Sequence, residues 1–340
     1  MTLDATGEAM APGAHLRVGY CCLNNTLKSA FRRTTLKKWQ SLLRGERETL
    51  CIQIVIQNLT ELKRLTEWNR QNRIMAYRIP SGLIPLVDHK QHTLHIQRLL
   101  KNTKAIQDAF LETARTMEAY RNAGGVVSLH PSQYIVLSSE KPDVVDSAVL
   151  HLDMACEFLG NIGCYPSVVN VHVSSGSTKE RSTEEIAKAV HRALQRLSSQ
   201  AQQCLTFENE DRGRWTVSNL VRYFEQPLVF DTLHWRTNPD TEDIRHAASA
   251  ALKTWQGTTL CPSMHFSSPL GRSEKLMRQH SDFVEQRPHA FGFQVMELEV
   301  KQKDLALLRL RQDLRKRDPQ CLPIDWGPLT QQLLKPEHNG

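Results

Sequence analysis

Cys-x-x-Cys motifs, long apolar runs and low-complexity segments are all missing from this chain of 340 residues. None of its eight cysteines belongs to a Cys-x-x-Cys pair, which argues against a structural zinc site or a thioredoxin-like motif. No stretch approaches the roughly 20 apolar residues that a membrane-spanning helix needs. Residues 1–12 lack the basic and apolar regions of a signal peptide. We therefore expect a cytoplasmic protein in a reducing compartment, with no membrane partner.

Composition and charge indicate a basic globular protein. Hydrophobic residues make up 40% of the chain and charged residues 23%, and the net charge is +7. The positive charge favours an anionic partner such as nucleic acid, but many proteins of other kinds share it. No linker or repeat divides the chain. We expect a flexible N-terminal segment at 1–14, one domain at 15–317 and a C-terminal extension at 318–340.

Eight short apolar runs alternate with longer helical segments along the chain. The helical segments, such as 36–71, 93–125 and 184–203, carry apolar residues at a spacing of three to four positions. Apolar runs without strict alternation, each followed by a helix, are typical of a parallel sheet covered by helices. A count of eight favours a closed (β/α)8 TIM barrel over an open doubly wound sheet. The predicted strands are 16–20, 73–79, 126–130, 167–173, 204–209, 227–231, 262–266 and 291–299.

Polar side chains recur where these strands end, and in such barrels the active site lies at the C-terminal ends of the strands. A single histidine there is more often a hydrogen-bonded rim residue. Glu208 alone could complement a helix N-terminus, and Asp231 alone could cap a helix. The recurrence of such residues at seven strands or their following loops favours a metal site. Its candidate ligands are His89, His130, His172, Glu208, Asp231, His234, His265 and Glu299.

The mixture of ligands restricts both the metal and its chemistry. Imidazole and carboxylate without thiolate suit Mn²⁺, Zn²⁺ or Fe²⁺. Eight ligands exceed what one tetrahedral ion takes, so we expect two or three ions that share bridging carboxylates. Clustered divalent ions activate water near neutral pH and stabilise charge on the attacking and leaving oxygens of a phosphodiester. In a basic protein, this chemistry favours hydrolysis of a nucleic-acid backbone.

Eight motifs occur in order: RVGY (17–20), YRIPSGLIPLVDH (77–89), SLHPSQYIVLSS (128–139), NVHVSSG (170–176), FENEDR (207–212), VFDTLHWRTNP (229–239), MHFSSP (264–269) and LEVKQKDLALLRL (298–310). Together they resemble the family of UV damage endonucleases, over about residues 16–312. The resemblance implies a TIM barrel with a trinuclear metal centre, akin to that of AP endonuclease. It also implies an ATP-independent cut of damaged double-stranded DNA. The cut would fall immediately 5′ to a cyclobutane dimer or 6-4 photoproduct, with abasic sites as a further substrate, and would leave a 3′-hydroxyl that starts excision repair.

The resemblance also implies roles for single residues. The eight candidate ligands fall on the metal-binding positions, for up to three divalent ions. Manganese is expected, with zinc or magnesium as the alternatives. Glu208, His265 and Glu299 are expected to be catalytic. Tyr20 and Asn24 fall near the scissile phosphate, and we count Tyr20 among the catalytic residues.

Two further groups of residues are expected to contact DNA. By the resemblance, Gln133 and Tyr134 fill the space left when damaged bases are turned out of the duplex. Such bases stack and pair poorly, so turning them out costs less than for intact bases. Arg212, Trp235 and Arg236 follow predicted strands at the same rim, where they either bind phosphates and stack or remain solvated.

One position departs from the family pattern. Many relatives carry a lysine two residues before the histidine of the seventh strand, carboxylated in some, whereas this chain has Ser263. Glu297 adds an acid nearby, either as an extra ligand or one layer deeper in the barrel. Three alternatives stay open: an AP endonuclease-like nuclease, a metal-dependent sugar isomerase, and a damage-binding protein with an impaired active site. We expect a monomer, associated with the nucleoid if the source is bacterial.

Overall fold

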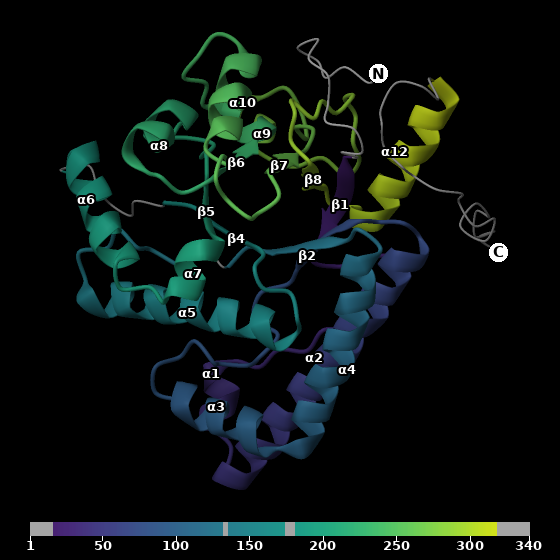
Figure 1. Ribbon diagram of the computed structural model, residues 1–340, viewed down its shortest axis with the longest axis vertical. Coiled ribbons are helices and arrows are strands. Elements are labelled where there is room, and N and C mark those ends of the chain that lie inside the picture. The colour runs from purple at the N-terminus through teal and green to yellow at the C-terminus, as the bar shows by residue number, and fades with distance from the viewer. Residues whose placement is uncertain (1–15, 132–134, 174–180, 318–340) are drawn as a thin grey trace.

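Eight parallel strands close into a barrel, as the sequence predicts (Figure 1). The computed structural model describes residues 16–131, 135–173 and 181–317. Each strand pairs with the next along the chain, and the first pairs with the last. The strands are β1 (Arg17–Cys21), β2 (Ala76–Ile79), β3 (Val126–Leu129), β4 (Val168–Val171), β5 (Leu205–Glu208), β6 (Leu228–Asp231), β7 (Ser263–Phe266) and β8 (Val295–Leu298).

Several strands are shorter than the sequence predicts, for local reasons. β2 begins only at Ala76, because Arg73 takes a left-handed turn with φ of 51° after the preceding helix. β8 begins only at Val295, because Phe291 and Gly292 both have positive φ. In β1, Gly19 lets the backbones approach closely, since a Cβ there would lie 1.9 Å from the carbonyl oxygen of Ala76.

Twelve helices lie among the described residues. Three segments that the sequence predicts as continuous are each broken in two: α1 and α2, α3 and α4, and α6 and α7. The breaks have local causes: Thr103 is extended between α3 and α4, and Ser198 caps α7 by accepting from the Ala201 N–H. The helices are α1 (Leu36–Gln40), α2 (Arg44–Gln71), α3 (Thr93–Asn102), α4 (Lys104–Asn122), α5 (Pro142–Asn161), α6 (Thr183–Leu194), α7 (Ser199–Cys204), α8 (Val217–Tyr223), α9 (Thr232–Thr237), α10 (Ile244–Lys253), α11 (Glu274–Met277) and α12 (Lys303–Arg317).

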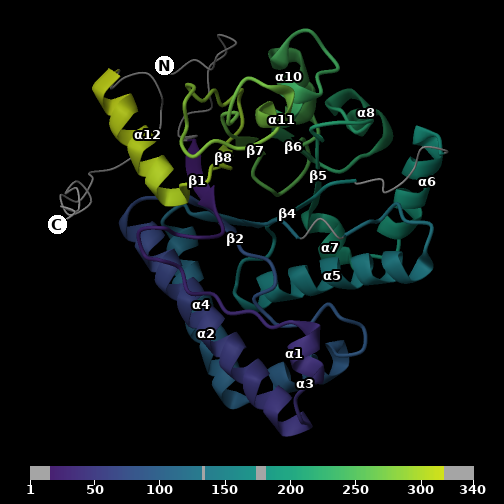
Figure 2. The ribbon, with the colours of Figure 1, turned by 180° about the vertical axis from the view of Figure 1, so that it is seen from behind.

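The helices cover the outside of the barrel and bury its apolar strands. α2 and α4 lie side by side, and α12 lies against β1 (Figures 1 and 2). The buried core is made of strand residues such as Val169 and Phe207 together with side chains from the covering helices. No helix in the described ranges combines the length and the apolar character needed to cross a bilayer. The polar residues of the barrel interior gather toward the C-terminal ends of the strands.

Candidate metal centre

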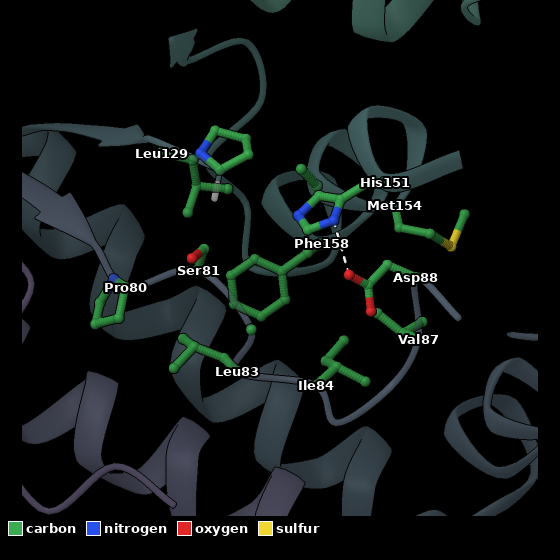
Figure 3. Close-up of a pocket in the computed structure, with 13 residues that line it drawn as sticks. Pro80, Ser81, Leu83, Ile84, Val87, Asp88, Leu129, His151, Met154 and Phe158 are labelled. Atoms are coloured by element: carbon green, nitrogen blue, oxygen red, sulfur yellow. Dashed lines mark ion pairs between the residues drawn. The ribbon is translucent and has the colours of Figure 1, made fainter. Parts of the chain in front are cut away.

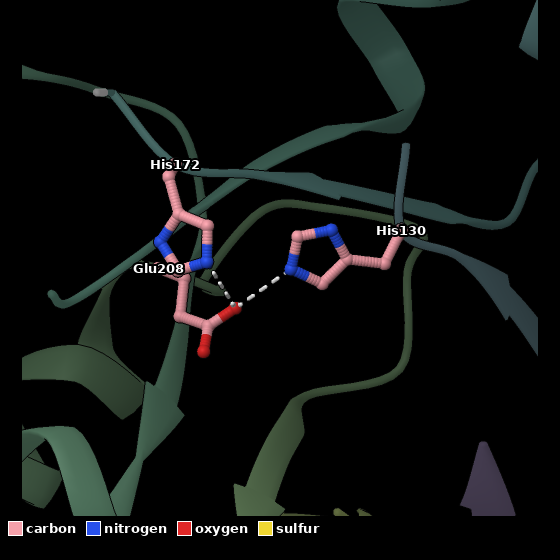
Figure 4. Close-up of side chains that lie close together, drawn as sticks. All are labelled: His130, His172 and Glu208. Atoms are coloured by element: carbon pink, nitrogen blue, oxygen red, sulfur yellow. Dashed lines mark ion pairs between the residues drawn. The ribbon is translucent and has the colours of Figure 1, made fainter. Parts of the chain in front are cut away.

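Glu208 lies at the centre of the polar cluster. It ends β5, is 1% exposed, and has imidazole nitrogens on both sides of its carboxylate. Figure 4 shows His130 and His172 pointing from the ends of β3 and β4 toward the same oxygen, Oε2. The four distances to the Glu208 oxygens are 3.3 Å for His130 Nε2, 3.8 Å for His172 Nε2, 3.2 Å for His234 Nδ1 and 3.1 Å for His265 Nδ1.

Seven of the eight predicted ligands form three overlapping groups. Within each group, one possible ligand atom per residue lies within 4.8 Å of the others. Glu208 belongs to the first and second groups, and Asp231 belongs to the second and third. This overlap is the arrangement expected of carboxylates that bridge neighbouring cations. The groups are His130, His172 and Glu208; Glu208, Asp231 and His234; and Asp231, His265 and Glu299.

Asp231 shows that these residues fit a cation. Its Oδ1 accepts from the backbone N–H of His234 at 2.7 Å and so caps α9. Its Oδ2 is buried and has no hydrogen-bond donor among the residues that the structure describes. A buried carboxylate oxygen without a partner is costly, and a bound cation removes that cost. Imidazole and carboxylate donors without thiolate suit a borderline or hard divalent ion.

Burial and mutual charge set the protonation of the cluster. Burial alone would raise the pKa of Glu208, but the imidazoles of His265 and His172 hold that pKa well below its usual value. Burial would lower the pKa of His265, but the carboxylates of Glu208 and Glu299 raise it to about 10. His172, in contrast, has its pKa lowered to about 4, chiefly by burial. A cation that binds here therefore competes with a proton on His265.

A charged layer lies below the three groups. Arg78 of β2 donates from Nε to Glu297 Oε2 at 2.8 Å and from Nη1 to Glu299. The hydroxyl of Ser128 donates to the other oxygen of Glu297. Burial alone would raise the pKa of Glu297, but Arg78 lowers it to about 2. Ser263 takes no part in this network, because its hydroxyl donates to the carbonyl of Cys261 at 2.8 Å.

His280 is a candidate ligand that the sequence analysis missed. Its Nε2 lies 3.6 Å from Glu299 Oε2, and its Nδ1 lies 2.8 Å from the hydroxyl of Ser267. An isolated bridge between Pro269 and His280 folds the loop after β7 back toward the barrel. His280 lies far along the loop after β7, and no local pattern in the sequence ties it to a strand end.

His89 lies apart from the three groups. It follows β2 in the loop that leads to α3, and its ring stacks on that of His92 with 4.9 Å between centroids. Its backbone N–H donates to the carbonyl of Leu86. A role of His89 as a metal ligand therefore stays a prediction.

Tyr20 and Asn24 form a buried pair at the first strand. The Tyr20 hydroxyl donates to Asn69 Oδ1 and accepts from Asn24 Nδ2, both at 2.9 Å. Asn24 Oδ1 accepts from the backbone N–H of Leu27 at 2.7 Å, which fixes the first loop. Burial raises the pKa of Tyr20 above its usual value. The pair is thus tied to α2 and to its own loop, and it lies outside the three ligand groups.

The predicted DNA-contacting residues occupy different surroundings. Arg212 is 76% exposed at its side chain. Arg236 donates to the side chain of Gln286, and the ring of Trp235 packs against the core. Gln133 and Tyr134 lie outside the described residues.

An apolar cavity lies on the other side of the β3 end (Figure 3). Leu129 and Pro131 line it, while His130 between them points to Glu208. Phe158 of α5 faces the cavity, and at one edge His151 Nδ1 lies 2.7 Å from Asp88 Oδ2. The chain at 129–131 therefore presents an apolar face to one side and a candidate ligand to the other.

A family model and the curated relatives of this chain agree on one family. The family model described as UV-endonuclease UvdE matches residues 16–322. The UV DNA damage endonuclease of Bacillus mycoides is 27% identical over 296 residues, covering 83% of this chain and 88% of that protein. The protein of the same name from Bacillus cereus strain B4264 is 26% identical over 307 residues, covering 84% and 90%.

A solved structure supports the fold. The crystal structure of SacUVDE superposes with a TM-score of 0.71 at 24% identity, and the match covers 89% of this chain and 99% of that one. The family match spans the whole barrel, including every strand that contributes to the cluster around Glu208. The chain is therefore a member of the UV-endonuclease UvdE family.

Proposed function

We propose that this protein cuts the backbone of damaged double-stranded DNA immediately 5′ to a UV photoproduct, by metal-dependent hydrolysis at the centre around Glu208. The observation that carries the proposal is the convergence of four imidazoles on one buried carboxylate, beside an oxygen of Asp231 that has no donor among the described residues. Family membership supports a nuclease over the sugar isomerase that the sequence left open.

The chain's own residues would divide the work at this centre. Glu208 and Asp231 belong to two groups each, so they would hold neighbouring cations at a fixed separation. His265 and Glu299 would complete the third group, with Arg78 holding Glu299 from below. Divalent ions bound here would supply activation of water and stabilisation of the negative charge that develops on the phosphodiester. Manganese is our proposed metal.

The lesion specificity is proposed for the segment that follows His130. Gln133 and Tyr134 come three and four residues after this candidate ligand, so the lesion probe and the metal centre would act on neighbouring nucleotides. An aromatic ring can stack in the gap left by damaged bases, and an amide can satisfy exposed base edges. Arg212 would add a phosphate contact at the rim.

End-labelled duplexes test the proposal. One carries a single cyclobutane dimer, the second a single abasic site, and the third no damage. The purified protein is incubated with each in the presence of Mn²⁺, and parallel reactions contain EDTA. We expect EDTA-sensitive incision at the 5′ side of the dimer, mapped on a sequencing gel. Incision of the abasic duplex alone would indicate an AP endonuclease, and incision of none would contradict the proposal.

A further inference from the structure

The layer below the candidate metal centre contains a carboxylate that nothing in the family assignment explains. Glu297 lies on β8, is 3% exposed, and pairs in register with His265 of β7. Residues two apart on a strand face the same side, so Glu297 lies one level below Glu299 in the barrel interior. The inference that follows rests on the metal centre proposed above.

The oxygens of Glu297 are already engaged. Oε2 accepts from Arg78 at Nε, 2.8 Å away, and at Nη2, 2.7 Å away. Oε1 accepts from the hydroxyl of Ser128 on β3. A carboxylate bound in this way to a guanidinium and a hydroxyl has little left to offer a cation. Its position and its partners fit a support for the centre better than a ligand of it.

Arg78 makes this support necessary. Its guanidinium is buried and always charged, and it lies directly beneath residues proposed to bind divalent cations. It also donates to Glu299 and lies 2.5 Å from His265 Nε2, so it touches two candidate ligands. Without Glu297, its charge would repel the cations and would draw Glu299 away from them.

Glu297 also faces the distal nitrogen of His265. Nδ1 of this imidazole points to Glu208 at 3.1 Å, while Nε2 lies 3.5 Å from Glu297 Oε2. Arg78 Nη2, which can only donate, lies closer to the same nitrogen, at 2.5 Å, so Glu297 holds the guanidinium that contacts His265.

We infer that Glu297 is a positioning residue of the metal centre: it neutralises Arg78 beneath the cations and holds its guanidinium in place against His265, while Glu299 remains free to bind metal. Loss of such an outer partner typically weakens metal binding about 10- to 100-fold. Glu297 should therefore strengthen metal binding through Arg78, without contacting the ions itself.

A charge cycle on the full-length protein tests this. Mn²⁺ affinity is measured by isothermal titration for the wild type, Glu297→Gln and the double variant Arg78→Gln/Glu297→Gln. Glu297→Gln should bind Mn²⁺ about 10- to 100-fold more weakly. The double variant should bind more tightly than Glu297→Gln, because the unpaired guanidinium is gone. Glu61→Gln is the matched control, since Glu61 is a buried partner of Arg64 on α2 and should not affect Mn²⁺.

The outcomes separate the possible roles. A double variant that binds no better than Glu297→Gln would make Glu297 a direct ligand and would overturn the inference. Unchanged affinity in Glu297→Gln would overturn it too, whereas a wild type that binds no Mn²⁺ would overturn the proposed metal centre itself. If Glu297→Gln does not fold, Ser128→Ala removes one hydrogen bond from the same carboxylate. It should weaken Mn²⁺ binding a few-fold, and an unchanged affinity would contradict the inference.

Discussion

The rim of the barrel, where the three ligand groups lie, and the layer beneath it both bury charged side chains, but with opposite consequences. At the rim, nitrogens and oxygens crowd around Glu208, and Asp231 Oδ2 has no donor within the described part of the chain. In the layer beneath, Arg78, Ser128 and Glu297 supply one another with donors and acceptors. The oxygen without a donor at the rim is available to a cation. The paired groups of the layer beneath hold the candidate ligands in place.

The largest effect on the rim is expected when Glu208 is changed. Glu208→Gln removes the charge that two of the ligand groups share. We expect Mn²⁺ content to fall and single-turnover incision of a dimer-containing duplex to drop by about 1000-fold or more, since clustered cations supply several kcal/mol of transition-state stabilisation. Metal content is measured by mass spectrometry of the dialysed protein. Wild-type incision in this variant would contradict the account of the rim, and Glu61→Gln serves again as the control.

The segment after His130 separates metal binding from lesion binding. Gln133→Ala combined with Tyr134→Ala should weaken binding to dimer-containing DNA about 10-fold or more, because stacking on one base contributes about 1–3 kcal/mol. Binding is measured by fluorescence anisotropy at fixed salt, and Mn²⁺ content should not change. Loss of the metal in this double variant would show that the pair supports the rim and does not probe DNA.

The smallest expected effect is the influence of the His265 proton on thermal stability. In the metal-free protein the pKa of His265 is raised from 6.5 to about 10, so its proton stabilises the fold fully below pH 6.5. That stabilisation is lost as the pH rises toward 10. A cation must displace the same proton, so the rise in Tm caused by Mn²⁺ should grow between pH 6.5 and 8.5.

Thermal unfolding with Mn²⁺ or with EDTA at several pH values measures this effect. His265→Gln is the control, because it carries no titrating group and should flatten the dependence on pH. A rise in Tm that is the same at every pH in the wild type would contradict this protonation of the rim.

The sequence locates the strand ends that form the rim because their signals are local. Pro131 cannot donate in a sheet, so β3 ends and leaves His130 at the rim, and similar strand ends supply Glu208 and Asp231. Each of these residues could be assigned from its own neighbours along the chain. The eight strands were predictable for the same reason.

The layer beneath the rim depends on contacts between distant segments. Glu297 meets His265 because β7 and β8 pair in one particular register, and it meets Arg78 because only β1 separates β8 from β2. His280 reaches Glu299 only because its loop folds back. The sequence places Glu297 near the site but leaves its role open, since no local pattern fixes a register or a loop path.

Crystals grown with Mn²⁺ and measured at the manganese absorption edge would locate the bound cations within the barrel. We expect anomalous peaks inside the barrel rim, at the three groups formed by His130, His172, Glu208, Asp231, His234, His265 and Glu299. The layer of Arg78, Ser128 and Glu297 should hold no peak. Active protein whose rim shows no peak, or a peak bound directly by Glu297, would contradict the account.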